Sequence, residues 1–159
     1  MGSGKTTVGQ ALADGLGRPF HDSDADLLAR TGRSARDIAA RDGVVALHAL
    51  ELEHLLDAVR ATQPAVISAA ASVIDAPQGR AVLASPDARV AWLRIDPAVA
   101  AERVQTGSHR PDNDMESQAA RRDPWFATVA EVVVDVAADD AASIAARLLD
   151  WASPGRSTR

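Results

Sequence analysis

The sequence predicts an α/β fold in which a parallel β-sheet is flanked by helices. Two observations lead to it. Short apolar segments typical of buried strands alternate with longer segments of helical periodicity, the pattern of a parallel sheet covered on both faces. The chain also begins with Gly2-Ser3-Gly4-Lys5-Thr6-Thr7, which matches the end of the phosphate-binding pattern G-x-x-x-x-G-K-S/T.

The first helix is expected over residues 6–16, where Val8, Leu12 and Leu16 recur at helical spacing and Gly17 closes the pattern. A short strand is expected at residues 18–22, and apolar runs predict strands at residues 64–68, 90–95 and 132–136. Further helices are expected at residues 24–31, 34–41, 44–61, 97–104 (Pro97 in its first turn), 116–130 (interrupted by Pro124) and 141–151. Gly107 and Pro111 predict a mobile loop over residues 106–115.

Composition places the chain among single globular domains. The 159 residues are 47% hydrophobic and 25% charged, which suits one domain over residues 1–152 followed by a flexible tail at 153–159. A net charge of −5 disfavours nucleic acid or an anionic membrane as partner. No apolar run is long enough for a membrane span, and the absence of cysteine excludes disulfides and thiolate metal sites. A cytoplasmic monomer with a small-molecule partner is expected.

Lys5 is the chain's single lysine among 17 basic residues. A lysine is a compact charge on a flexible stem, so it fits between phosphates inside a tight glycine loop where the planar fork of arginine does not. The lysine, the glycines and the helix that follows therefore predict a nucleotide-phosphate site. A flexible glycine-rich start is the alternative.

Five further sequence features follow the phosphate-binding stretch in a fixed order along the chain. They are Asp22-Ser23-Asp24 at the end of the strand expected at residues 18–22, an acidic helix near Glu51, a small-residue turn at residues 69–71, Arg110-Pro111 in the loop, and Arg122 ahead of a proline–aromatic pair. In this order the chain resembles the shikimate kinases, which are small P-loop kinases. The resemblance implies a three-layer fold and transfer of the γ-phosphate of ATP to a hydroxyl of shikimate, in aromatic amino acid biosynthesis.

The resemblance also implies roles on the nucleotide side. Gly2, Ser3, Gly4, Lys5, Thr6 and Thr7 would bind ATP, with the Thr6 hydroxyl and Asp22 holding Mg²⁺. Arg110 would reach the phosphates when the loop at residues 106–115 closes as a lid, neutralising charge that develops during transfer. A solvated loop arginine is the alternative for Arg110.

On the acceptor side, Asp24 would bind the substrate hydroxyl and take its proton, and Arg122 would clamp the substrate carboxylate. The alternative for residues 22–26 is that they only cap the next helix. Asp26 is expected to face solvent. Trp125 and Phe126 are expected to pack in the core.

The chain departs from the family pattern at two acceptor-side positions. His48 stands where the family has an arginine, and it supplies one hydrogen bond instead of a bidentate fork. It is interpreted either as a substrate contact or as a half-buried helix residue. Ala69, Ala70 and Ala71 replace a triple glycine, which would narrow or reshape the pocket. Ser72 could then offer its hydroxyl to a different acceptor.

The third departure from the family pattern is at the N-terminus. The first glycine of the phosphate-binding pattern and the central strand before it would precede Met1, so we expect the natural product to begin upstream.

Two alternatives to a shikimate kinase remain at the level of sequence. One is a kinase of the same fold acting on another hydroxylated acceptor, and the other is a nucleotide-binding protein with impaired catalysis.

Overall fold

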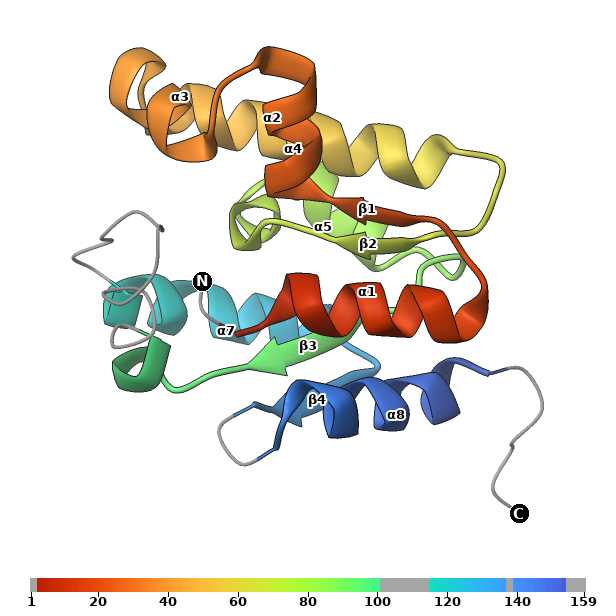
Figure 1. Ribbon diagram of the computed structural model, residues 1–159. Coiled ribbons are helices and arrows are strands. Elements are labelled where there is room, and N and C mark those ends of the chain that lie inside the picture. Colours follow the sequence, from red (N-terminus) through yellow and green to blue (C-terminus); the bar gives the residue numbers. More distant parts are fainter. Residues whose placement is uncertain (1–2, 101–114, 137–138, 154–159) are drawn as a thin grey trace.

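Helices and strands follow one another largely as the sequence predicts. The computed structural model describes residues 3–100, 115–136 and 139–153 (Figure 1). Its elements are α1 (Lys5–Leu16), β1 (Phe20–Asp22), α2 (Ser23–Thr31), α3 (Ala35–Asp42), α4 (Val44–Arg60), β2 (Val66–Ser68), the 3₁₀ helix η1 (Ala71–Asp75), α5 (Pro77–Leu83), β3 (Ala91–Arg94), α7 (Met115–Val129), β4 (Val132–Asp135) and α8 (Ala141–Ala152).

Three details differ from the expectations. η1 and α5 follow β2, where no helix was predicted. Helix α7 continues through Pro124 without the expected interruption. Helical structure begins at residue 97, but the rest of the predicted segment 97–104, most of the predicted lid and the tail beyond residue 153 lie outside the described residues.

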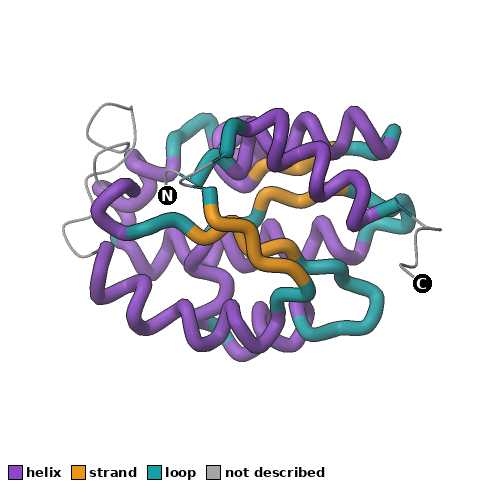
Figure 2. The backbone as a smooth tube through the Cα atoms, turned by 90° about the horizontal axis from the view of Figure 1, so that it is seen from below, coloured by secondary structure: helices purple, strands orange, loops and turns teal. Residues whose placement is uncertain are grey.

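The strands form two parallel pairs with helices on both sides. In one pair Phe20 lies opposite Val66, and in the other Ala91 lies opposite Val132. Within the described ranges, the two pairs remain separate two-stranded sheets. Helix α1 packs against β2 and α8, while α5 and α7 lie behind the strands in Figure 1, and Figure 2 shows helices on either side of the orange strands. The predicted three-layer α/β class is confirmed.

Two apolar clusters hold these layers together. The larger joins α1, β4 and α8 through Val8, Leu12, Val134, Val136, Ile144, Ala145 and Leu148. The smaller joins α2, α3 and α4 through Leu27, Ile38 and Leu47. Because α1 and α2 are each anchored by a cluster, the loop before α1 and the junction of β1 with α2 are held in place. None of the helices described is long and apolar enough to cross a membrane.

Candidate active site

The phosphate-binding stretch leads directly into α1. Gly4 is the N-cap and has φ of 78°, a left-handed conformation that side-chain-bearing residues rarely adopt. The first intrahelical bond runs from the Val8 amide to the Gly4 carbonyl, so the amides of the first turn point out of the helix. Such a helix start favours an anion. Gly2 lies outside the described residues, and Ser3 is buried beside the turn.

Thr6 and Asp22 meet at the end of β1. The Thr6 hydroxyl donates from Oγ1 to Asp22 Oδ2 at 2.8 Å. The other oxygen, Asp22 Oδ1, accepts from the amides of Asp24 and Ala25 at 3.1 Å and caps α2. One Asp22 oxygen therefore caps the helix, as the alternative interpretation of the acidic stretch expects, while the other bonds to Thr6, the residue that the resemblance assigns to Mg²⁺ together with Asp22.

Lys5 lies among three carboxylates. Desolvation by burial lowers the pKa of the Lys5 ammonium, while the charges of Asp24, Asp22 and Glu51, in decreasing order, act against that shift. The lysine of α1, the two aspartates at the β1–α2 junction and the glutamate of α4 thus converge on one spot. This brings together the predicted nucleotide-side and acceptor-side residues Lys5, Asp22 and Asp24.

Asp24 and Asp26 lie on different sides of α2. Asp24 is exposed in the first turn, near Lys5. Asp26 does not simply face solvent as expected, because its Oδ2 accepts from His54 Nε2 at 2.7 Å and lies 3.5 Å from His21 Nδ1. The expectation for Asp26 is wrong because His54, 28 residues away on α4, packs against that face of α2.

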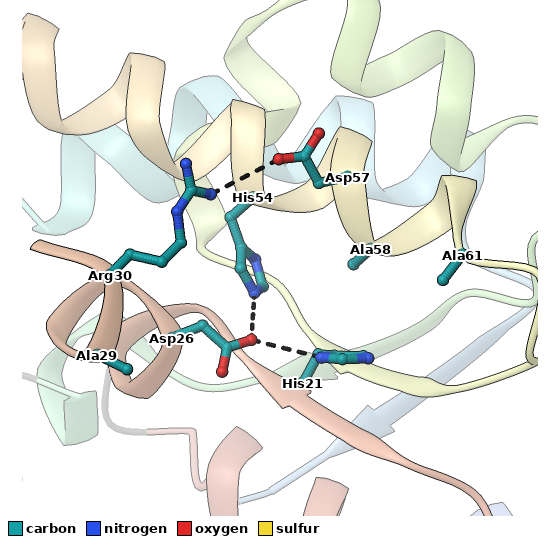
Figure 3. Close-up of a pocket in the computed structure, with 8 residues that line it drawn as sticks. All are labelled: His21, Asp26, Ala29, Arg30, His54, Asp57, Ala58 and Ala61. Atoms are coloured by element: carbon teal, nitrogen blue, oxygen red, sulfur yellow. Dashed lines mark hydrogen bonds and ion pairs between the residues drawn. The ribbon is translucent and has the colours of Figure 1, made fainter.

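This histidine pair belongs to a pocket of about 440 Å³ at the edge of β1, lined by His21, Asp26, Ala29, Arg30, His54, Asp57, Ala58 and Ala61 (Figure 3). His54 is buried, and its Nδ1 finds no hydrogen-bond partner among the described residues. Arg30 is 3.6 Å from Asp57 across the opening. Lys5, Thr6, Asp22 and Asp24 are not part of its lining, so the pocket is separate from the carboxylate cluster around Lys5.

The helix η1 connects that cluster with α7. Ser72 donates a short hydrogen bond to Glu51 Oε2, and both side chains are buried. Three residues later, Asp75 Oδ2 accepts from Arg122 Nε at 3.0 Å and from its NH2 at 2.8 Å. The arginine that the resemblance assigns to the substrate carboxylate is therefore bound by a carboxylate of the chain itself.

Arg122 is buried and fully engaged on three nitrogens, since its NH1 also donates to Gln118 Oε1 at 2.6 Å. Arg121 adds a 3.0 Å contact to the same Asp75 oxygen. Burial by itself would raise the pKa of the Asp75 carboxyl, but hydrogen bonding and charge from Arg122, with Arg121 and His48, outweigh it, so the pKa lies below its ordinary value.

The two family departures fall beside this contact. His48 is half-buried on α4 and close enough to Asp75 to help lower its pKa. Ala69 and Ala70 connect β2 to η1, Ala71 begins η1, and all three are half-buried. Among the described residues only glycines have positive φ. The alanines thus adopt ordinary backbone, and their effect on the turn is the volume of three methyl groups.

The aromatic pair on α7 divides between surface and interior. Phe126 stacks on Trp92 with ring centroids 5.6 Å apart, as a core residue does. Trp125 is 45% exposed and lies under the Arg80 guanidinium at 4.3 Å, so its predicted place in the core is wrong. The two residues point to different sides because neighbouring positions on a helix do not share a face.

Sequence reasoning missed Asp75, Arg121 and Gln118 as residues near the acceptor-side arginine. None of them belongs to a motif, and η1 was not predicted. The only available signal was the position of Asp75 shortly after the alanine turn. Arg110 lies outside the described residues, and its predicted role stays a prediction.

Comparison with known proteins gives one consistent result. The family model described as shikimate kinase matches residues 1–153. The shikimate kinase of Halorhodospira halophila is 32% identical over 157 residues, covering 94% of this chain and 88% of that protein. The shikimate kinase of Thermobifida fusca is 42% identical over 110 residues, a match that spans 69% of this chain and 62% of the relative.

Solved structures agree with the sequence relatives. Shikimate kinase from Acinetobacter baumannii in complex with shikimate has a TM-score of 0.84 and 25% identity, covering 95% of this chain and 87% of that one. Shikimate kinase from Aquifex aeolicus has a TM-score of 0.77 and 24% identity and supports the fold alone.

Proposed function

Since this chain belongs to the shikimate kinase family, we propose that it transfers the γ-phosphate of ATP to a hydroxyl of shikimate, giving ADP and shikimate 3-phosphate. The observation that carries the proposal is the 2.8 Å bond from Thr6 to Asp22, which joins the start of α1 to the start of α2, with the charges of Asp22 and Asp24 acting on Lys5. Phosphoryl transfer needs phosphate binding and an oriented, deprotonated hydroxyl at one point. In the proposed site, Lys5 and Asp22 would serve the phosphates and Asp24 the hydroxyl.

On the nucleotide side, the first-turn amides of α1 and the Lys5 ammonium would bind the phosphates. The oxygens of Thr6 and Asp22 suit Mg²⁺, which prefers hard oxygen ligands and takes few of them from protein. When bound, Mg²⁺ would neutralise negative charge on the transferring phosphate. The helix-capping oxygen of Asp22 would keep its partner oxygen aimed at Thr6.

On the acceptor side, Asp24 would accept the proton of the attacking hydroxyl. Two observations support this role: Asp24 is exposed at the start of α2, and its charge acts on Lys5. Arg122 would bind the shikimate carboxylate. Arg110 would complete the charge around the phosphates, a role that rests on the family pattern alone.

The test is a coupled assay of ADP release with shikimate and ATP, with phosphorylated shikimate identified by mass spectrometry. Asp24→Asn should reduce kcat by more than about a hundredfold, the usual contribution of a general base, while ATP affinity stays unchanged. Asp14→Asn is the matched control, because Asp14 is exposed further along α1 and bonds to Gln10. ADP release no faster with shikimate than without it would refute the proposal.

A further inference from the structure

The Asp75 carboxylate is already bound to the guanidinium of Arg122, which the proposed function assigns to the carboxylate of the acceptor. Its Oδ2 accepts from Arg122 Nε and NH2 at 3.0 and 2.8 Å and from Arg121 NH2 at 3.0 Å. A carboxylate on an arginine fork is the same chemical contact that an acid substrate would make. The side chain of Asp75 is therefore a carboxylate from within the chain at a carboxylate-binding position.

The geometry of η1 aims Asp75 toward the acceptor side. In a 3₁₀ helix, residues three apart lie on the same edge. Ser72 and Asp75 have this spacing, and the Ser72 hydroxyl bonds to Glu51, whose charge acts on Lys5. Asp75 thus lies along the same edge of η1 that faces the carboxylate cluster, and His48 of α4 acts on its charge as well.

We infer that Asp75 is a specificity-determining residue that competes with the carboxylate of the acceptor for Arg122. This inference rests on the proposed function. An acid acceptor has to displace Asp75 from the Nε–NH2 edge or bind beside it against like-charge repulsion. A neutral acceptor of the same shape meets no such competition. The preference of the protein for acid over neutral acceptors is therefore smaller than Arg122 would give without Asp75.

Exposure makes this exchange feasible. The Arg122 side chain is 10% exposed, so its charge is held in place by the fold, whereas Asp75 is 26% exposed and opens to solvent. Exchange of carboxylates at Arg122 needs no opening of the core. Once Asp75 leaves, Arg121 and Arg122 provide two positive charges for one incoming carboxylate, with His48 close by.

The test compares equilibrium binding of shikimate and of its neutral methyl ester, by calorimetry in the presence of ADP. Asp75→Asn should tighten binding of shikimate roughly three- to tenfold, the range expected for removing one partly exposed charge pair. Binding of the ester should stay unchanged. Asp75→Ser, which also removes the charge in a smaller side chain, should show the same shift if Asp75→Asn folds poorly. Asp87→Asn is the matched control, since Asp87 is exposed in the turn after α5.

The outcomes separate the inference from the proposed function. Unchanged or weaker shikimate binding in both Asp75 variants overturns the inference, as does an equal change for acid and ester, which a merely structural role would produce. Failure of the wild-type protein and of both variants to bind shikimate overturns it too. Binding without ADP release counts against the proposed function, while the ratio of acid to ester affinities still decides the role of Asp75.

Discussion

The Thr6 hydroxyl donates to Asp22 across 16 residues of chain, and the same Asp22 carboxylate caps α2. One side chain thereby fixes the phosphate-binding turn relative to the helix that bears Asp24. This contact sets the relative positions of the residues predicted for the nucleotide and for the acceptor, because one Asp22 oxygen bonds to α1 and the other caps α2.

Substitutions at Asp22 should separate these two roles. Asp22→Asn keeps a good N-cap but loses the negative charge. We therefore expect kcat to fall and half-maximal activity to need a higher Mg²⁺ concentration, while the free energy of unfolding changes little. Asp22→Ala also loses the cap and should cost about 1 kcal/mol of additional stability. Urea unfolding and kcat measured over a series of Mg²⁺ concentrations check both. Equal destabilisation by the two substitutions would contradict the division of roles.

Lys5 should make stability depend on alkaline pH. The folded pKa of Lys5 lies below its ordinary 10.5, so between the two values the unfolded chain binds more protons and stability rises with pH. The chain has no tyrosine or cysteine and no other lysine, so Lys5 is the side chain that titrates in this window. The melting temperature should therefore rise as pH approaches 10.5.

Lys5→Met should remove this rise and lower turnover by a hundredfold or more, roughly the effect of losing one charged group from a phosphoryl-transfer site. Melting curves of the two proteins between pH 8.5 and 10.5, the range below the ordinary lysine pKa, provide the comparison. Parallel pH dependence in the wild-type protein and in Lys5→Met would show that Lys5 is not desolvated.

Asp75 should make stability depend on acidic pH. Its folded pKa lies below the ordinary 3.8, so its contribution is complete above that value and is lost as pH falls through the folded pKa. Asp75→Asn should cost about 1–3 kcal/mol near neutral pH, the usual loss for a hydrogen bond to a charged partner. Urea unfolding from pH 6 down to about 3 should show the difference from the wild-type protein shrinking. A constant difference would mean that the Arg122 contact does not depend on the charge of Asp75.

Gly79 supports η1 from α5. A Cβ at this position would lie 2.0 Å from the Val73 carbonyl oxygen, which belongs to the backbone of η1. Gly79→Ala should therefore cost about 3 kcal/mol and weaken the Asp75–Arg122 contact, because the backbone of η1 has to move. Thermal melting and urea unfolding measure the loss.

Gly15→Ala is the matched control. It adds a methyl group next to the flexible end of Leu149, inside a helix, where alanine is favoured over glycine. It should leave stability unchanged or raise it. Similar losses for both substitutions would mean that the position of η1 does not depend on Gly79.

Helices and strands that carry local signals could be predicted from the sequence. Apolar periodicity predicted most strands and helices to within a few residues, and the Gly4-Lys5 pair marked the turn before α1. The lysine in that turn pointed to phosphate. These features depend on residues within one or two turns of each other, so local patterns carry them.

Contacts between side chains far apart in the sequence could not be predicted, because they arise only when the helices and strands pack. Asp75 and Arg122 are 47 residues apart, Asp26 and His54 are 28 apart, and Ser72 and Glu51 are 21 apart. No local pattern encodes such pairs, because each depends on how α2, α4, η1 and α7 pack. The aspartate expected to face solvent and the arginine expected to await substrate were therefore both found with partners that only packing brings to them.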